Sequence, residues 1–596
     1  MASMARRSVT NLTLLPTGLP ALGRVRPPLI ALALGLMLLV ATASASAQST
    51  GGAPAGGRPN VVFVMTDDQT VESMKVMSKV RAGIQAPGTT FTNSIATFPL
   101  CCPSRATYLT GQYAHNHGVI NNVPPFGGYT RLDHSNTLPV WLQRAGYRTV
   151  HIGRYLNGYG VQNPDITEIP PGWTDWISNL DPTTYGYDRW RMNDHGQILE
   201  LPGPDRPAEF QTDYLGRRAA EMIEQAAPSD QPFFLSLTFP APHSGTPVDP
   251  DDPPGLATPS PAPRHRDAFA GTPLPRPPGF DEKAVADKPG FVRRRSRLSP
   301  GQAVAVQEGY RQELESLLSV DDAVAGVMSA LQRTGELDNT LVIFTSDNGF
   351  MHGEHRIRAA KVFAYEPSIR VPLIMRGPGV PAGLRLSEPV GNIDLAPTIL
   401  AAAGASPGRL PDGRSLFDRM FDPQARSGRE LVLENGRGLR TVSAFSGLRN
   451  DRYAYVRYAR SGERELYDLK RDPYELANLS QSKRYARIQE LLDRRLRRLR
   501  SCRGTGCESS RPAVSVRGRC VTGATRLALS GREASRVRGV RYYAGGRSLG
   551  ATRKRPFRLM APASRLPSAR QGTVRARVTM VDGRIATFDR RLASCR

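Results

Sequence analysis

The chain has 596 residues, 40% of them hydrophobic, and a net charge of +26 at pH 7. This length excludes a single small module and allows several domains with a large buried core. The charge is uneven, because residues 501–596 hold 22 Lys or Arg against 4 acidic residues. A strongly basic segment favours an anionic partner. The alternative is compositional, since 71 Arg against 8 Lys indicate a genome that favours Arg codons.

The N-terminus has the pattern of a cleaved secretion signal. Arg24 and Arg26 precede an apolar run over 29–40, and the small residues 45–47 follow it. The apolar run is shorter than the roughly 20 residues that span a bilayer. We therefore predict a signal peptide over 1–47, a linker over 48–58, and a secreted, cell-surface or periplasmic location. A retained N-terminal anchor is the alternative.

Two apolar runs predict buried strands, 61–65 and 341–345. Between them, helical patterns recur at 138–145, 219–226 and 312–331. Strands that alternate with helices predict an α/β domain over 59–440, with a large, mostly parallel sheet flanked by helices. The Pro-rich segment 240–300 has Pro242 and His243 near its start and is expected to form part of a site wall.

Polar side chains follow both predicted strands. Asp67 and Asp68 come after the first strand, and Asp347 and Asn348 come after the second. Ligands of parallel sheets bind beyond the carboxyl ends of the strands, so we expect these four residues to converge there. Three carboxylates and an amide form a hard oxygen-donor set, which suits Ca²⁺, or Mg²⁺, rather than zinc.

The segments after residue 440 change character. Short alternating strands and a basic amphipathic helix at 484–500 predict a small antiparallel subdomain over 441–500. A linker over 501–514 and a basic immunoglobulin-like β domain over 515–596 follow. Four cysteines allow three disulfide pairings, of which we favour Cys502–Cys507 and Cys520–Cys595.

The other two cysteines lie in the run Cys101-Cys102-Pro103-Ser104-Arg105, which follows an apolar stretch. A pair of buried small hydrophobic residues is the structural alternative, because free cysteine packs well in cores. However, Cys-x-Pro-Ser-Arg resembles the sulfatase signature, in which the first cysteine is oxidised to formylglycine.

The resemblance extends along most of the chain. The matching stretches are 58–69, 101–119, 146–155, 171–173, 242–243, 277–292, 346–365, 371–379 and 465–475. The chain resembles formylglycine-dependent sulfatases of the alkaline phosphatase superfamily. Within them it is most similar to N-acetylglucosamine-6-sulfatases and heparan 6-O-endosulfatases. An alkaline-phosphatase-like fold is the implied architecture.

The resemblance also implies roles for individual residues. It implies a Ca²⁺ site in which Cys101, converted to formylglycine by a formylglycine-generating enzyme, completes the shell of the four ligands named above. Arg105 would steady the formylglycine hydrate, and His243 would contact sulfate or the leaving oxygen. Lys361 and Asn157 would bind substrate.

The chain departs from the family pattern at two positions. Arg154 stands where the family has lysine, and a planar guanidinium is not equivalent to a compact ammonium at a tight site. Leu156 stands where many sulfatases place a histidine that helps to deprotonate the hydrate. His352 and His355, which follow the ligands Asp347 and Asn348, are candidates for that proton-handling role.

Together these observations predict an exported sulfatase that acts on sulfate monoesters, with the 6-O-sulfate of glucosamine-type sugars or glycosaminoglycans as substrate. The basic C-terminal domain is expected to bind an anionic polymer or the cell wall, and not nucleic acid. Two alternatives stay open. One is a phosphoester or phosphonate hydrolase of the same superfamily, and the other is a non-catalytic polyanion-binding surface protein.

Overall fold

The computed structural model describes most of the chain after residue 57. The described residues are 58–163, 165–203, 207–250, 252–421, 423, 428–436, 444–507, 515–521, 524–530, 534, 537–544, 547–555, 557–562, 573–580 and 585–591. The predicted signal peptide and all but the last residue of the predicted linker lie outside them.

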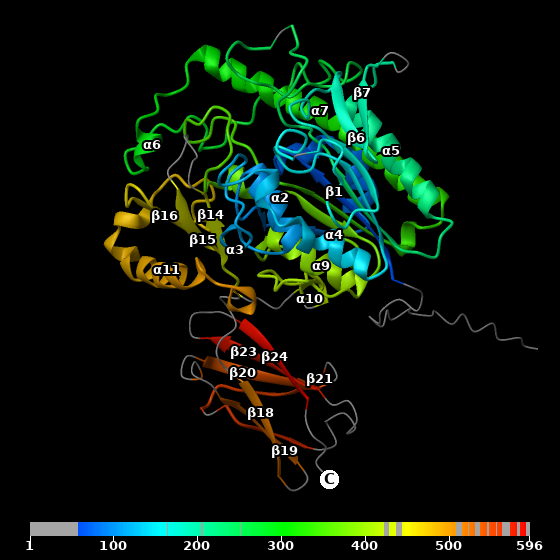
Figure 1. The fold of residues 1–596 in the computed structure, drawn as a ribbon. Coiled ribbons are helices and arrows are strands. Elements are labelled where there is room, and N and C mark those ends of the chain that lie inside the picture. Colours follow the sequence, from blue (N-terminus) through cyan, green and yellow to red (C-terminus); the bar gives the residue numbers. More distant parts are fainter. Residues whose placement is uncertain are drawn as a thin grey trace, which may run out of the picture. The chain divides into compact units, whose positions relative to one another are not determined.

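A ten-stranded sheet forms the centre of the main domain, in the order β12-β2-β11-β9-β1-β8-β4-β5-β6-β7 (Figure 1). Its middle strands, β9-β1-β8-β4-β5, are parallel, and antiparallel neighbours flank them on both sides. The predicted α/β class with a mostly parallel sheet is confirmed. The strands are β1 (Asn60–Thr66), β2 (Thr89–Phe91), β4 (Arg148–Gly153), β5 (Asp175–Asn179), β6 (Trp190–Asp194), β7 (Gln197–Leu201), β8 (Phe233–Thr238), β9 (Thr340–Ser346), β11 (Leu373–Arg376) and β12 (Leu384–Leu386).

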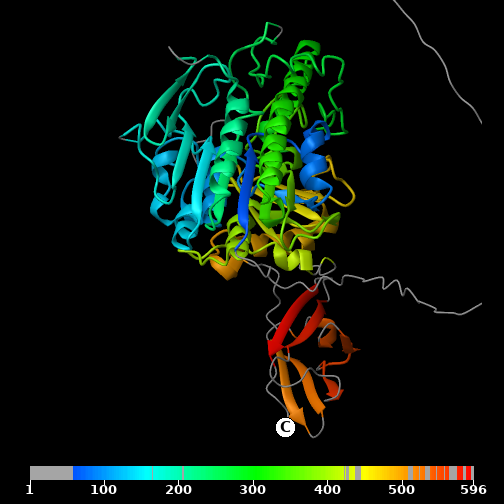
Figure 2. The ribbon, with the colours of Figure 1, turned by 90° about the vertical axis from the view of Figure 1, so that its right-hand side faces the viewer.

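Strand β1 is buried along its whole length because helices cover both faces of the sheet. Val61, Phe63 and Met65 join one hydrophobic cluster, while Val62 and Val64 join another. This alternation follows from the two-residue period of a strand. Helices α5 (Gln211–Ala226) and α7 (Pro300–Arg333) lie side by side over one face (Figure 2). Helices α2 (Cys101–Thr110), α4 (Leu138–Arg144) and α9 (Leu395–Ala403) contribute to the cluster on the other face.

The helical patterns at 138–145, 219–226 and 312–331 fall within α4, α5 and α7 to within one residue. Helix α7 begins earlier than its pattern predicts, because Ser299 and Gln302 form a reciprocal N-terminal capping box. The shorter elements are α1 (Ser78–Val80), α3 (Ala114–His117), α6 (Gly290–Arg293), α8 (Glu366–Ile369), α10 (Phe417–Phe421) and the small sheet β10 (Arg370–Val371), β3 (Ser94–Ile95) and β13 (Val390–Gly391).

A separate antiparallel sheet is formed by β14 (Leu431–Glu434), β15 (Phe445–Arg449), β16 (Tyr453–Tyr458) and β17 (Arg464–Asp468). The amphipathic helix α11 (Ala486–Leu499) packs on it through Leu492, Leu496 and Leu499, which share a core with Tyr455. The Cys502–Cys507 disulfide is confirmed. The second expected disulfide, Cys520–Cys595, stays a prediction because Cys595 lies outside the described residues.

The C-terminal region contains two antiparallel sheets. One has the order β18-β19-β22, and the other has the order β21-β20-β23-β24. Side chains from both sheets share one hydrophobic cluster, which includes Leu527, Tyr542 and Val574. The immunoglobulin-like topology stays a prediction. The strands are β18 (Ser515–Val521), β19 (Ala524–Ser530), β20 (Val537–Ala544), β21 (Arg547–Thr552), β22 (Leu559–Pro562), β23 (Thr573–Met580) and β24 (Ile585–Arg591).

Within the described ranges, no helix combines the length and the apolar character that crossing a lipid bilayer requires.

Strand β4 ends at a glycine that no other residue replaces without strain. Gly153 has φ +108°, and a Cβ atom there would lie 1.9 Å from the carbonyl oxygen of Thr238. The same oxygen accepts a hydrogen bond of 2.9 Å from the amide of Arg154, so the close approach fixes where the Arg154 side chain starts.

We expect Gly153→Ala to lower the free energy of unfolding by at least about 2 kcal/mol, since the methyl group must displace a backbone carbonyl. Gly335→Ala is the matched control, because Gly335 also has a positive φ (+77°), but a Cβ atom added there would meet no heavy atom within 4 Å. Urea denaturation of both variants measures the difference. Equal losses would show that the contact with Thr238 is unimportant.

Candidate active site

The carboxyl ends of β1 and β9 deliver four of the predicted site residues to one point. The two strands pair in parallel with Thr66 opposite Ser346, so the residues that follow each strand are neighbours. The amide of Asp68 donates to Asp347 Oδ1 at 3.3 Å. Carboxylate oxygens of Asp67, Asp68 and Asp347 lie within 4.8 Å of one another, and all three residues are buried. Asp68 has φ 71°, a left-handed conformation that turns its side chain into this cluster.

Helix α2 places Cys101 against the same cluster. The helix begins at Cys101, after the extended residue Leu100, and ends at Gly111, which adopts the left-handed conformation. Cys101 Sγ lies 3.6 Å from Asp67 Oδ1. One turn further on, Ser104 Oγ donates to the carbonyl oxygen of Asp347 at 2.5 Å. The helix is therefore tied to the loop that carries the acidic residues.

Two arginines compensate the charge of the buried carboxylates. Arg105 Nε donates to Asp347 Oδ2 at 2.9 Å, and its Nη2 lies 3.4 Å from Asp67 Oδ2. Arg154 forms an ion pair with Asp67 and lies 3.5 Å from Asp347 Oδ2. Its guanidinium also stacks over the ring of Tyr185, 5.0 Å from the ring centre. Both arginines bridge the same two carboxylates, because a planar guanidinium can donate in several directions at once.

Lys361 supplies the third cation. Its Nζ lies 2.6 and 2.7 Å from the two carboxylate oxygens of Asp68 and 2.9 Å from Cys101 Sγ. Despite this ammonium, burial raises the pKa of the Cys101 thiol to about 12. The same desolvation raises the pKa of Cys102 to about 12. At neutral pH both side chains are thiols, and neither offers the thiolate that nucleophilic cysteine chemistry needs.

One atom of the cluster points to a bound cation. Asn348 Nδ2 donates to Asp68 Oδ1 at 2.5 Å, whereas Asn348 Oδ1 is buried and accepts no hydrogen bond from any described residue. A buried amide oxygen without a partner is costly unless a cation or a donor satisfies it. With the three carboxylates, it forms a set of hard oxygen donors that fits Ca²⁺ or Mg²⁺.

His243 lies at the rim of this cluster, in the segment that follows β8. Its Nδ1 donates to the carbonyl oxygen of Ser244 at 2.8 Å, and its ring stacks on Tyr185 with ring centres 4.0 Å apart. His243 Nε2 lies 3.8 Å from Asp68 Oδ2. Burial lowers the pKa of His243 well below its ordinary value, which favours the neutral ring.

The other candidates divide between this site and its surroundings. Asn157 Oδ1 accepts a hydrogen bond of 3.2 Å from Arg154 Nη2, so Asn157 contacts the site through that arginine. Leu156 is buried in the hydrophobic core. His355 pairs with Glu282, with Nδ1 and Oε2 2.7 Å apart, and His352 pairs with Glu313 at 3.1 Å. No contact joins either of these two described histidines to Cys101.

Sequence reasoning missed two residues that shape the site. Tyr185, between β5 and β6, holds both His243 and Arg154 with its ring. Arg358 lines a small cavity of about 30 Å³ together with Asp68 and Pro242. Neither residue lies at a strand end, although Arg358 falls within the stretch 346–365 that matches the family pattern. Arg358 did carry a positional clue, because it lies between the metal-type ligands and Lys361.

Two family models match the chain. The model described as Sulfatase matches residues 59–405, and the model described as N-sulphoglucosamine sulphohydrolase, C-terminal, matches residues 353–502. The chain is 33% identical to an arylsulfatase of Volvox carteri over 76% of each chain. It is 31% identical to an N-acetylglucosamine-6-sulfatase of Capra hircus, over 78% of this chain and 87% of the relative.

The fold matches a solved structure that is described as a complex with its substrate, D-glucosamine-2-N,6-O-disulfate. The match has a TM-score of 0.62 and 24% sequence identity, and covers 74% of this chain and 97% of the other.

We expect Arg154→Met, studied after treatment with a chelator, to lower the free energy of unfolding by about 3 kcal/mol, because Asp67 and Asp347 lose a buried partner cation. Arg154→Lys should lose about 1 kcal/mol, since the ammonium keeps the charge but not the two-sided contact or the stacking on Tyr185. Urea denaturation measures both. Unchanged stability of the Met variant would show that Arg105 and Lys361 compensate the cluster alone.

Proposed function

This chain belongs to the sulfatase family and is a sulfuric ester hydrolase, and we propose that its substrates are 6-O-sulfated glucosamine-type sugars. The observation that carries the catalytic part is the convergence of Cys101 and Lys361 on three buried carboxylates. The substrate is inferred from the N-acetylglucosamine-6-sulfatase relative and from the ligand of the solved structure with the same fold.

We propose that Cys101 acts after conversion to formylglycine. A protonated, buried thiol is a poor nucleophile, and a sulfated thiol has no second hydroxyl with which to expel sulfate. The hydrated aldehyde would supply one hydroxyl to attack sulfur and a second to release the sulfate. In this proposal, the position of Cys101 at the start of α2 aims that side chain at Asp67 and Lys361.

The surrounding residues orient the ester and handle charge. We propose that Lys361 pairs with a sulfate oxygen, which is supported by the contacts of its Nζ with Asp68 and Cys101. Arg105 and Arg154 keep Asp67 and Asp347 in fixed positions. We propose that binding of the anionic ester favours protonation of His243 at Nε2 and that this nitrogen gives its proton to the leaving sugar oxygen, while the Nδ1 contact with Ser244 fixes the ring.

We propose Ca²⁺ as the resident cation, held by Asp67, Asp68, Asp347 and Asn348 with the converted Cys101 as an additional ligand. A divalent cation supplies positive charge that offsets the repulsion between an anionic sulfate ester and its nucleophile. The support is the hard oxygen-donor set and the unsatisfied Asn348 Oδ1.

We further propose that the protein is exported and that its basic C-terminal domain binds an anionic polymer or the cell wall. The Cys502–Cys507 disulfide supports an oxidising environment. The excess of Lys and Arg after residue 500 supports a polyanionic partner for that domain.

The formylglycine proposal is tested by the mass of the tryptic peptide 82–105 from protein made in its own host. We expect the mass decrease of thiol-to-aldehyde conversion at Cys101, with Cys102 unchanged. Cys101→Ala should abolish turnover of a 6-O-sulfated N-acetylglucosamine, whereas Cys102→Ala should retain it. An active enzyme whose Cys101 is unmodified would refute the mechanism. Faster turnover of matched phosphate or phosphonate esters would instead support a phosphorus-ester hydrolase.

The metal proposal predicts that Ca²⁺ raises the melting temperature of the chelator-treated protein. When the Ca²⁺ concentration is 100 times the dissociation constant, binding to the folded state alone raises the free energy of unfolding by about 2.7 kcal/mol. Asn348→Ala should remove most of this calcium-dependent shift, because it deletes the unsatisfied oxygen. Asn163→Ala is the control: its amide is also buried, but it serves a loop in which Nδ2 contacts the Asp165 carbonyl. An unaltered shift in the Asn348 variant would exclude this residue as a ligand.

A further inference from the structure

One arginine beside the candidate active site has no ionic partner. Arg358 lines the small cavity that also reaches Asp68, and it is exposed. It lies three residues before Lys361, whose Nζ contacts Asp68 Oδ1 at 2.6 Å. No carboxylate of a described residue pairs with Arg358. A permanently charged guanidinium is therefore available next to the place where the sulfate ester is proposed to bind.

The other charged residues that line the small cavity are compensated. Asp68 pairs with Lys361 at 2.6 Å, and Glu313 pairs with His352 at 3.1 Å. Burial raises the pKa of Glu313 to about 7, which further lessens the negative charge there. Among the described residues that line this cavity, Arg358 alone carries a charge without a counterpart.

Two further guanidiniums belong to the same part of the fold as Arg358. Arg356 donates to the carbonyl oxygens of Glu282, Arg295 and Lys283 at 2.8, 2.8 and 2.9 Å. These bonds hold the segment after β9 against the segment that leads to Arg295. Arg295 Nε is buried and has no hydrogen-bond partner among the described residues. Burial, and then the charge of Arg358, lower the pKa of Arg295, so the two guanidiniums are close enough to repel each other.

Two acidic residues flank this cluster of three arginines, and both have other partners. Glu282 pairs with Lys288 at 3.0 Å and with His355 at 2.7 Å. Glu354 Oε2 accepts a hydrogen bond of 2.6 Å from the amide of His352. Neither carboxylate forms an ion pair with the three guanidiniums. Like charges without a counterion repel one another, and an anion that binds beside them offsets this repulsion.

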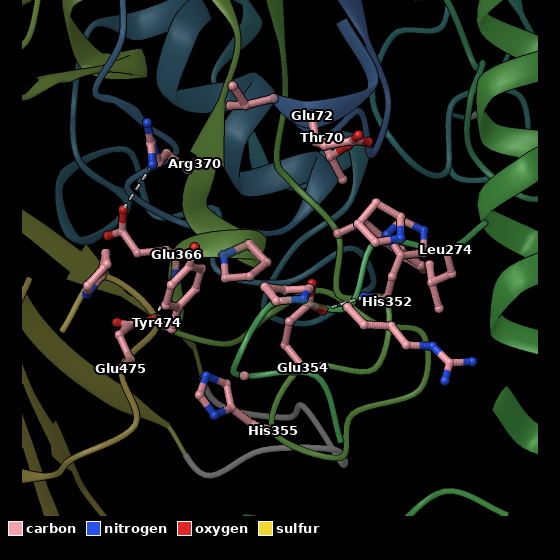
Figure 3. A pocket seen from close by; sticks show the side chains of 18 of the residues that line it. Thr70, Glu72, Leu274, His352, Glu354, His355, Glu366, Arg370, Tyr474 and Glu475 are labelled. Carbon is pink, nitrogen blue, oxygen red and sulfur yellow. Dashed lines mark hydrogen bonds and ion pairs between the residues drawn. The ribbon is translucent and has the colours of Figure 1, made fainter. Parts of the chain in front are cut away.

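A larger cavity, of about 570 Å³, leaves room for a substrate beside Arg358 (Figure 3). Phe350 and His352 line both this cavity and the small one. Thr70, two residues after Asp68, also lines the larger cavity. Its volume is in the range of small-molecule sites. A sugar whose sulfate lies at the buried carboxylates therefore has space to extend past the guanidinium.

We propose that Arg358 binds a second anionic group of the substrate, a sulfate or a carboxylate close to the sulfate ester that is cleaved. Arg295 adds positive charge behind this contact, and Arg356 keeps the two segments together. Either oxyanion presents two oxygens to a guanidinium. The inference rests on the proposed sulfatase function. It narrows the substrate class to 6-O-sulfated glucosamines with another negative group, an N-sulfate on the same ring or a uronate on the next.

The test measures kcat/KM of the converted enzyme for two matched pairs of substrates. The first pair is 6-O-sulfated glucosamine with an N-sulfate or an N-acetyl group. The second pair is 6-O-sulfated N-acetylglucosamine linked to glucuronate or to glucose. We expect at least one anionic member to exceed its neutral counterpart by about tenfold. The pair that shows this preference identifies the source of the anion.

Arg358→Gln should reduce the ratio within that pair to about one, and Arg358→Lys should keep part of it because the charge remains. A ratio between two substrates of one variant is unaffected by a general loss of folded or converted protein. Arg144→Gln is the matched control, since Arg144 is an exposed arginine of α4 without a described ion pair and lies outside both cavity linings. It should leave the ratio unchanged.

Ratios near one for both pairs in the wild-type enzyme, or a preference that Arg358→Gln leaves intact, would overturn the inference. Inactivity of the converted enzyme on all four sulfate esters would refute the proposed function instead. In that case calorimetry with the same four glycans without the 6-O-sulfate decides. Tighter binding of an anionic member that Arg358→Gln abolishes supports the subsite, and any other result overturns it.

Discussion

Mutual repulsion between three buried carboxylates is the constraint on which the rest of the site depends. Asp67, Asp68 and Asp347 are brought together because β1 and β9 pair in parallel and in register. Isolated buried charges are too costly to persist, so the fold must supply cations at the same place. Helix α2 supplies Arg105, and the end of β4 supplies Arg154. The arrangement of three separate elements therefore follows from one electrostatic requirement.

The need to compensate these carboxylates also explains why Lys361 has several short contacts. Lys361 Nζ contacts both oxygens of Asp68 and the sulfur of Cys101. It lies between β9 and α8, where Ala360 forms an antiparallel bridge with Met351 and the amide of Val362 donates to the carbonyl oxygen of Pro99.

The sequence allowed the central features to be predicted because they depend on local patterns. Two apolar runs that end in acidic residues specify buried strands with polar ends, and β1 and β9 match them. The helix boundaries were less accurate, since Ser299 and Gln302 cap α7 well before its apolar periodicity begins.

Contacts made by residues in irregular segments could not be predicted. The bridging role of Arg154 depends on the close approach of Gly153 to Thr238, and the position of Tyr185 depends on an irregular loop. His352 and His355 were candidates because they follow the ligands closely in sequence. Yet each side chain turns to a buried glutamate on another segment. For residues in a loop, proximity in sequence to the ligands therefore does not predict proximity in space.

The burial of α2 has a consequence for when the proposed modification of Cys101 takes place. Cys101 is 1% exposed, and every residue of the helix that begins with it is buried. The proposed conversion of Cys101 needs access to that side chain, and the folded chain buries it. The conversion would therefore take place before folding is complete, and a chain that folded first would keep an unmodified thiol.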